Sequence, residues 1–381
     1  MKGLRKGAAV MASAGGQSSL IPRYPSLDGV RGFAALLVVV FHSSVILRSG
    51  VTSDPLIRAL TLVISGFGDI AVAVFFSLSG FLLFKEFAND LIDRAGRKPL
   101  YRYSSRRFLR IYPAYWVALI GAELIIGPLV GARIGLFSLT ARYSDSINFF
   151  PGLGVAWTLA VEVSFYVFLP VFSLTLGQFS RRMHTRNCRI ALVTLLTLLL
   201  LAVPSLYQHF VIERFPADLR FHGFLFQYLD WFALGMLLSI AAVLVESGWQ
   251  SNSVVFKIVT SRSINWPAAA LLYAWATWII GFDGSKVSIS LSALDGSIAH
   301  ACFGLAAFLF LIPLTVGTRA SLQVGFFASR LMFEVGLVSY GVYLWHDTML
   351  KWYLWNVKYQ TGIGPFLAVL AVLIPVSLVI G

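Results

Sequence analysis

The sequence predicts an all-α integral membrane protein with about ten transmembrane helices. Of its 381 residues, 58% are hydrophobic and only 12% are charged, which is about half the charged fraction of a soluble domain. Aromatic residues make up 14%, a share that suits lipid-facing surfaces and interfacial belts. The apolar residues fall in runs of about 20, the length that spans a bilayer, and no loop is long enough for a separate soluble domain.

Ten apolar runs are expected to form the helices. In chain order they are Phe33–Val51, Leu60–Phe84, Phe108–Val130, Val155–Leu176, Ile190–Tyr207, Phe224–Val245, Ile264–Phe282, Ile298–Gly317, Leu331–Trp352 and Ile363–Ile380. We expect each boundary to shift by a few residues, because hydropathy marks the apolar part of a helix and not its ends.

The distribution of basic residues predicts the orientation. With the N-terminus inside, the tail and the inner loops hold 21 of the 30 Lys and Arg residues, and the other side holds 9. Cytoplasmic loops of membrane proteins carry an excess of Lys and Arg. Both termini are therefore predicted to be cytoplasmic, in a bacterial inner (plasma) membrane.

Two regions are distinguished along the chain. Residues 1–22 include an Ala/Gly/Ser-rich stretch without the apolar centre of a signal peptide, and we expect a disordered cytoplasmic tail there. Residues 23–381 are expected to form the membrane domain. The net charge of +13 collects in short loops between apolar runs, so we expect the lipid bilayer and no nucleic acid as a partner. The two cysteines offer neither a disulfide framework nor metal-ligand spacing, and no metal is expected.

Arg31 and His42 share one helix face. Eleven residues separate them, which is three turns plus about 20° of rotation and an axial rise of about 16 Å. A phosphate-bearing cofactor with a long flexible arm suits that layout, because its phosphates can lie at the surface while its reactive end reaches the imidazole. The alternative is a structural histidine bonded to another helix, with Arg31 as an ordinary cytoplasmic flank.

Arg107 and Arg110 form a second basic pair, three residues apart at the start of a predicted helix. Residues at that spacing share a face, and two guanidiniums there can hold phosphate bidentately. The alternative is an anchor at the cytoplasmic membrane surface.

Glu162 and Ser79 are polar positions inside predicted helices. An intramembrane carboxylate needs a partner, so Glu162 is expected to pair with an arginine, to orient His42, or to form a purely structural salt bridge. Ser79 with Gly80 suits close helix packing, or a hydroxyl contact to a ligand. His346 either faces the same cavity as His42 or is a satisfied interhelical histidine. Asp230 has no spacing argument, and His300 is expected in a loop or at an interface.

Several segments together resemble the acyltransferase-3 family of bacterial membrane O-acyltransferases. They are Leu27-Asp28-Gly29-Val30-Arg31-Gly32 to Phe41-His42, Phe75-Phe76 to Ser79-Gly80-Phe81-Leu82, Arg107 to Trp116, Trp157-Thr158-Leu159 to Glu162 with Phe165-Tyr166, and Tyr343-Leu344-Trp345-His346. The resemblance covers nearly the whole chain, from about Tyr24 to the last helix.

That resemblance implies a ten-helix enzyme that transfers an acyl group, with acetyl preferred, from cytoplasmic acetyl-CoA or another acyl-CoA to a hydroxyl of a cell-surface or exported glycan, glycolipid or similar acceptor. It implies functional roles for the Arg31 and His42 motif and for the Arg107 and Arg110 motif. His42 then acts as a base or as an acyl carrier, with Glu162 orienting it or balancing charge nearby, and the arginines and Ser79 bind the donor.

One feature of the sequence departs from that expectation. Many members of the family continue past the last helix, some into a hydrolase domain, whereas this sequence stops at Gly381, so we expect a truncated chain or an unusual end without that domain. The competing interpretation is a proton-coupled transporter or flippase of a glycolipid or small molecule, with the buried ionisable residues as its relay. A catalytically inactive sensor or scaffold is a third interpretation.

Overall fold

The structure, a computed structural model, describes residues 24–48, 54–96, 99–127, 133–140, 153–215, 221, 223–248, 254–280, 293–316, 325–356 and 362–380. The predicted tail, residues 1–22, lies outside the described residues. So do the last residues of the predicted helices that end at Val51, Val130, Phe282 and Gly317.

Each of the ten predicted runs coincides with a helix or a continuous helical stretch. The helices are α2 (Pro25–Ser43), α3 (Val45–Arg48), α4 (Pro55–Ser65), α5 (Phe67–Asp93), α6 (Leu100–Ile126), α7 (Arg133–Phe137), α9 (Ala156–Arg182), α10 (Arg186–Leu199), α11 (Val203–Tyr207), α12 (Leu225–Glu246), α13 (Val254–Val259), α14 (Arg262–Ile280), α15 (Ala293–Thr315), α16 (Arg330–Asn356) and α17 (Ile363–Ile380). No strand occurs within the described ranges. Seven of the described helical stretches are long and apolar enough to cross a membrane, which confirms the predicted fold class.

The structure corrects several boundaries. The first three predicted helices begin five to eight residues earlier than expected, because backbone hydrogen bonding continues into polar flanks where the hydropathy falls. The second is divided at Gly66 into α4 and α5 and extends to Asp93. The fifth ends as an α-helix at Leu199, and a 3₁₀ turn and a new helix follow, with Pro204 in the first turn of α11. Proline lacks the N–H that a continuous helix would need there.

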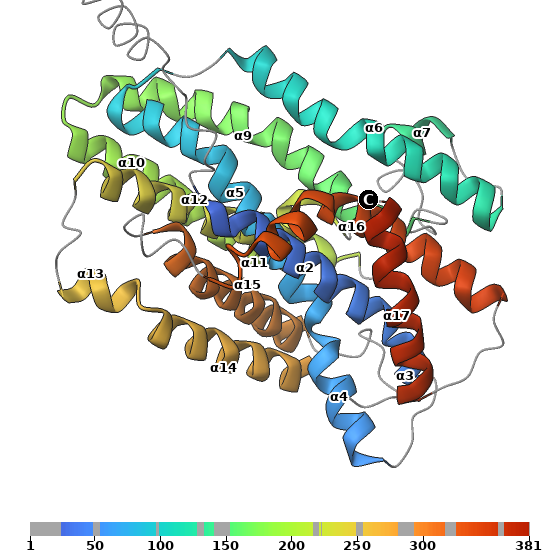
Figure 1. The fold of residues 1–381 in the computed structure, drawn as a ribbon. Helices are drawn as coiled ribbons and strands as arrows, with labels where there is room; N and C mark the ends of the chain where they lie inside the picture. Colours follow the sequence, from blue (N-terminus) through green and yellow to red (C-terminus); the bar gives the residue numbers. More distant parts are fainter. Residues whose placement is uncertain are drawn as a thin grey trace, which may run out of the picture.

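The helix α5 lies at the centre of the bundle, in contact with α2, α9, α12 and α15. Figure 1 shows α6 and α9 along one side of this centre and α14 and α15 along the other. Glycines let the central helices touch through their backbones. A Cβ on Gly80 of α5 would lie 2.1 Å from the carbonyl oxygen of Phe232 on α12. The close-packing interpretation of the Ser79-Gly80 pair is thus correct for Gly80.

The same device joins α2 to α16. A Cβ on Gly336 would lie 2.2 Å from the carbonyl oxygen of Asp28, and one on Gly32 would lie 2.8 Å from the Gly336 nitrogen. Any larger residue would push these helices apart, so the two glycines set the distance between the side chains of α2 and α16.

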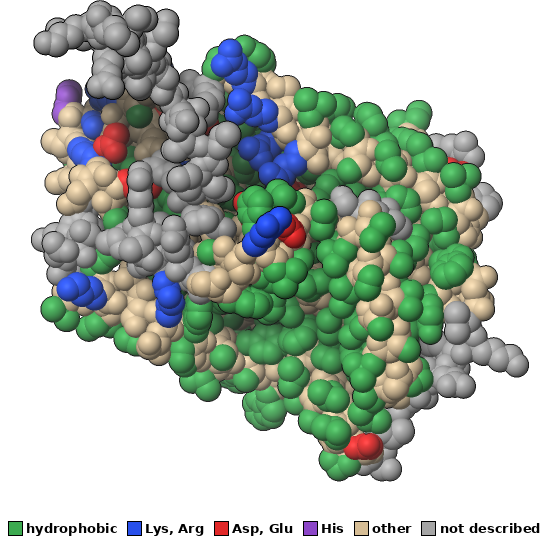
Figure 2. All heavy atoms as spheres, viewed as in Figure 1, with side chains coloured by type: hydrophobic (Ala, Val, Ile, Leu, Met, Phe, Trp, Pro, Cys, Tyr) green, Lys and Arg blue, Asp and Glu red, His purple; other side chains and the backbone are tan. Residues whose placement is uncertain are grey.

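Charge is unevenly distributed over the surface. On the face shown in Figure 2, Lys and Arg side chains gather toward one half of the molecule, and the other half shows many hydrophobic and few charged side chains. The asymmetry is of the kind that the basic loops predict. The side of the membrane on which each terminus lies stays a prediction.

Candidate functional site

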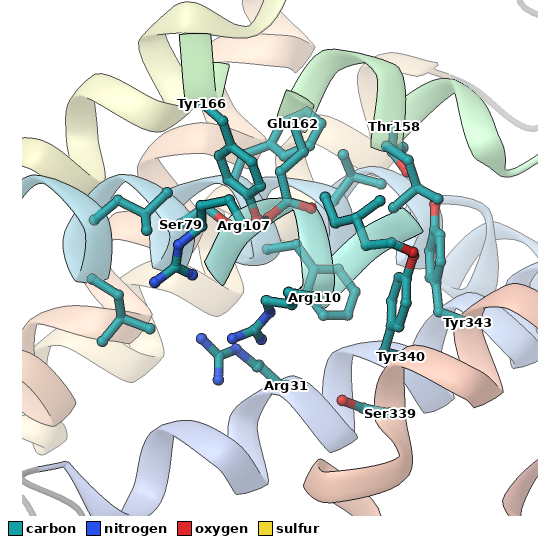
Figure 3. Close-up of a pocket in the computed structure, with 17 residues that line it drawn as sticks. Arg31, Ser79, Arg107, Arg110, Thr158, Glu162, Tyr166, Ser339, Tyr340 and Tyr343 are labelled. Atoms are coloured by element: carbon teal, nitrogen blue, oxygen red, sulfur yellow. Dashed lines mark hydrogen bonds between the residues drawn. The ribbon is translucent and has the colours of Figure 1, made fainter. Parts of the chain in front are cut away.

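A pocket opens between five helices, with walls from α2, α5, α6, α9 and α16 (Figure 3). It comprises about 800 Å³, including the part that is open to solvent. Five of the six predicted site residues line it: Arg31, Ser79, Arg107, Arg110 and Glu162. Residues that lie up to 131 positions apart in the sequence are therefore brought to one place.

Three arginines give the pocket its positive charge. Arg31 comes from α2, and Arg107 and Arg110 come from successive turns of α6. Figure 3 shows the guanidiniums of Arg31 and Arg110 close together, with Arg107 beside the same space. Arg31 donates to Asp28 Oδ1 at 3.0 Å. Neither Arg107 nor Arg110 has a carboxylate within 4.0 Å among the described residues.

Arg107 carries unused hydrogen-bonding capacity. Its Nε is buried and has no hydrogen-bond partner in the described part of the chain. Its guanidinium lies 5.9 Å from the ring centroid of Tyr166, which holds the side chain without satisfying its donors. Buried donors in native proteins are nearly always paired, so this one indicates a group that the protein alone does not provide. An anion with several oxygens meets that need and relieves the repulsion between the arginines.

Glu162 lies on the opposite wall, on α9. Its Oε1 accepts hydrogen bonds from Ser79 Oγ at 2.9 Å and from Tyr166 OH at 2.6 Å. Neither of the two partners named for this carboxylate, an arginine and His42, forms a hydrogen bond with it among the described contacts. The Ser79 hydroxyl is engaged by Glu162, so its expected contact with a ligand would have to compete with this bond.

The wall formed by α16 is polar. Tyr343 OH lies 2.6 Å from Thr158 Oγ1, and either hydroxyl can be the donor of that bond. Where Thr158 is the donor, Tyr343 OH donates to the carbonyl oxygen of Val155 at 3.1 Å. Tyr340 OH donates to the carbonyl oxygen of Ile111 at 2.9 Å. These bonds fix α16 against α9 and α6 and keep the pocket walls in register.

His42, the sixth predicted residue, lies outside the lining of this pocket, farther along α2. Its Nδ1 is 2.9 Å from the carbonyl oxygen of Val38 and 3.4 Å from Nε2 of His346 on α16. Tyr343 links the two places, because it lines the pocket and its ring centroid is 5.8 Å from that of His346. Since α2 is continuous from Pro25 to Ser43, the predicted common face of Arg31 and His42 is preserved.

Sequence reasoning assigned no role to four of the polar lining residues, Thr158, Tyr166, Ser339 and Tyr340. A signal for some of them was present. Thr158, Glu162 and Tyr166 are spaced four apart and therefore share one face of α9.

Two further ionisable groups in the helices, His300 and Lys85, are paired within the protein. His300 was expected in a loop or at an interface, but it lies inside α15 and its Nε2 is 3.0 Å from Asp230 Oδ2. Lys85 lies one residue past the predicted apolar run that ends at Phe84; it is buried and donates to Glu246 and Tyr24. The described residues contain no group of three or more His, Cys, Asp and Glu side chains suited to a metal ion.

Comparisons with known proteins agree with this architecture. The sequence model of the acyltransferase-3 family, described as an acyltransferase domain, matches residues 24–381. The O-acetyltransferase OatA of Staphylococcus aureus is 25% identical over 354 residues, which cover 85% of this chain and 50% of that protein. The acyltransferase MdmB of Streptomyces mycarofaciens is 32% identical over 163 residues, 40% of each chain. The putative peptidoglycan O-acetyltransferase YrhL of Bacillus subtilis is 28% identical over 195 residues, 46% of this chain and 27% of that protein.

This chain spans about half the length of OatA. No solved structure matches it. The family match extends over the whole membrane bundle and includes every residue of the pocket and of the histidine pair. The chain therefore belongs to the acyltransferase-3 family of multi-pass membrane proteins.

Proposed function

We propose that this protein transfers an acyl group, with acetyl preferred, from cytoplasmic acyl-CoA to a hydroxyl group of a cell-surface or exported glycan or glycolipid, in a bacterial plasma membrane. The observation that carries this proposal is the cluster of Arg31, Arg107 and Arg110 around a pocket whose wall continues along α16 toward His42. The family membership supports an acyltransferase reaction.

The arginines are proposed to bind the phosphates of the donor. Guanidinium groups form charge-assisted, bidentate bonds with phosphate oxygens, and the buried Nε of Arg107 has a donor to spare. Arg31 and His42 differ by about 16 Å in height along α2, so a donor held at the arginines needs a long arm to bring its thioester to the imidazole. Coenzyme A has such an arm.

The chemistry needs one base. His42 Nε2 takes the proton of the acceptor hydroxyl, whose oxygen attacks the thioester carbonyl and forms the new C–O bond. The tetrahedral intermediate collapses, the C–S bond breaks, and the departing thiolate takes the proton from the imidazolium. In the second route His42 attacks the thioester itself, releases the thiol and passes the acyl group to the hydroxyl.

Glu162 is proposed to set the charge of the pocket. The carboxylate faces three arginines and accepts bonds from Ser79 and Tyr166, so it limits the net positive charge while it fixes these two side chains. We propose the acceptor class from the relatives, which are named as O-acetyltransferases, in one case of peptidoglycan.

The test uses purified protein in nanodiscs with labelled acetyl-CoA and a glycolipid extract. Wild type, His42→Ala and a control, His184→Ala at an exposed loop position, are compared for donor binding and thiol release. We expect all three to bind the donor, and only His42→Ala to lose turnover, by about 10²–10⁴-fold.

A protein that binds neither acetyl-CoA nor longer acyl-CoA would contradict the donor assignment. That result would favour the transporter or flippase interpretation, since a transporter binds its substrate without consuming CoA. Its relay would use partly buried ionisable groups such as the Asp230 and His300 pair.

A further inference from the structure

The imidazoles of His42 and His346 lie against each other, where the last turn of α2 meets α16. Their ring centroids are 5.0 Å apart, and His346 is only 1% exposed. They come from α2 and α16, which are 304 residues apart at these positions and are joined through the backbone contact at Gly32 and Gly336. The proximity is therefore a product of the fold and not of local sequence.

Hydrogen-bond partners assign the tautomer of each ring. The Nδ1 atom of His42 is 2.9 Å from the Val38 carbonyl oxygen, and Nδ1 of His346 is 3.2 Å from the Val342 carbonyl oxygen. A carbonyl oxygen only accepts, so both Nδ1 atoms carry the proton in the neutral rings. The opposite tautomer of His346 would set a lone pair on Nδ1 against the oxygen of Val342.

This assignment makes Nε2 of His346 a hydrogen-bond acceptor. Its Nε2 carries a lone pair, and that atom is 3.4 Å from Nδ1 of His42. The Nδ1 proton of His42 is thus shared between the Val38 carbonyl oxygen and His346, in a long bifurcated bond. The same assignment leaves the lone pair of His42 on Nε2, which is the form that a base or nucleophile requires.

We infer that His346 is a positioning residue for His42, which holds the Nδ1–H tautomer and stabilises the imidazolium that forms when His42 Nε2 takes a proton. The inference rests on the proposed function. When His42 gains a positive charge, its Nδ1–H becomes a charge-assisted donor, and such bonds are shorter and about twice as strong as neutral ones. A carboxylate performs this task in serine hydrolases, but a neutral acceptor avoids a second full charge in the membrane interior.

The surroundings keep His346 in place. The next residue, Asp347, accepts from the backbone N–H of Gly154 at 2.7 Å and from Lys351 at 2.8 Å, so this part of α16 is tied to the start of α9. The ring of Tyr343 packs against His346 from one turn earlier. The imidazole can therefore present Nε2 to His42 without searching other rotamers.

Three substitutions test the inference. In His346→Gln, the side-chain oxygen reaches the position of Nε2 and still accepts. In His346→Leu the volume is similar and no acceptor remains. In His346→Asn the amide reaches only the position of Nδ1. Each variant is measured for thermal unfolding, acetyl-CoA binding, kcat and KM in nanodiscs beside wild type.

We expect His346→Leu to lower kcat by about 100-fold or more while acetyl-CoA affinity stays within about threefold, and His346→Gln to keep at least about tenfold more activity than Leu or Asn. A Leu variant with wild-type kcat would overturn the inference, as would Gln no better than Asn. If the Leu variant fails to fold, the comparison of Gln with Asn decides. Wild type without acyl transfer would instead contradict the proposed function itself.

Discussion

Two basic clusters in this bundle, the arginine pocket and the cluster around Lys85, are constructed in opposite ways. Lys85 is 8% exposed, donates to Tyr24 and to Glu246, and lies 4.5 Å from the ring centroid of Tyr24. Arg107, by contrast, has a buried Nε without a partner among the described residues.

This difference distinguishes a cluster that stabilises the fold from one that can bind a ligand. A buried charge that its own protein pairs and hydrogen-bonds is part of the packing, and removing one partner leaves the other exposed to a large desolvation cost. A cation with unpaired donors in an open pocket does little for stability and is available for an anion. The Lys85 cluster is therefore expected to respond in folding, and the arginine pocket in binding.

The largest expected effect is on donor affinity. Replacing both Arg107 and Arg110 by Gln removes two charged donors, and each bond to a charged group contributes about 1.5–3 kcal/mol. We expect the affinity for acetyl-CoA to fall by about 100-fold or more, at an unchanged free energy of unfolding. Titration of labelled acetyl-CoA on protein in nanodiscs measures it.

A matched control for that experiment is Arg106→Gln, because Arg106 is exposed on the same helix and does not line the pocket. Its donor affinity is expected to stay within about threefold of wild type. A loss as large as that of the double variant would show that the general charge of α6, and not the pocket, attracts the donor.

Lys85→Met tests the other side of the comparison. It removes the ion pair between Lys85 and Glu246, and we expect the free energy of unfolding to fall by about 2 kcal/mol, below the range for fully buried pairs because the Glu246 side chain is 31% exposed. Equilibrium unfolding by SDS in mixed micelles measures the change. A stable variant that no longer binds acetyl-CoA would reverse the roles assigned to the two clusters.

Asp230→Asn addresses the second internally satisfied pair. The amide oxygen still accepts from His300, so we expect a loss of about 1 kcal/mol in stability and an unchanged rate of acyl transfer. Thiol release and unfolding are followed on the same preparation. A large loss of turnover in a well-folded variant would instead favour a relay through this pair.

Ser79→Ala is expected to have the smallest effect. The hydroxyl donates to Glu162, which keeps its bond from Tyr166, so we expect donor affinity to stay within about threefold. A tenfold loss in the acetyl-CoA titration would indicate that Ser79 contacts the donor directly.

The sequence predicts the helices well because the bilayer imposes their length, and apolar runs of that length are visible without an alignment. The sequence predicts the ends of the helices poorly. The predicted apolar run stops at Phe84 and does not contain Lys85, although α5 continues to Asp93. The 3₁₀ turn before Pro204 likewise depends on local backbone geometry that a hydropathy average does not contain.

Helical periodicity also predicts part of the site. It puts Arg31 and His42 on one face and Arg107 next to Arg110, since these relations exist within single helices. It cannot place His346 against His42 or Ser79 against Glu162, because those distances are set by how α2 packs on α16 and α5 on α9. Tertiary packing determined these contacts, and the backbone approach at Gly336 is one of its causes.

The most direct test of the account is a cryo-electron microscopy structure of the protein in nanodiscs with a non-hydrolysable thioether analogue of acetyl-CoA. We predict phosphate density within hydrogen-bonding distance of Arg107 and Arg110, and the thioether end directed along α16 toward His42 and His346. Density for the analogue at any other place, with the arginine pocket filled only by water, would contradict the account.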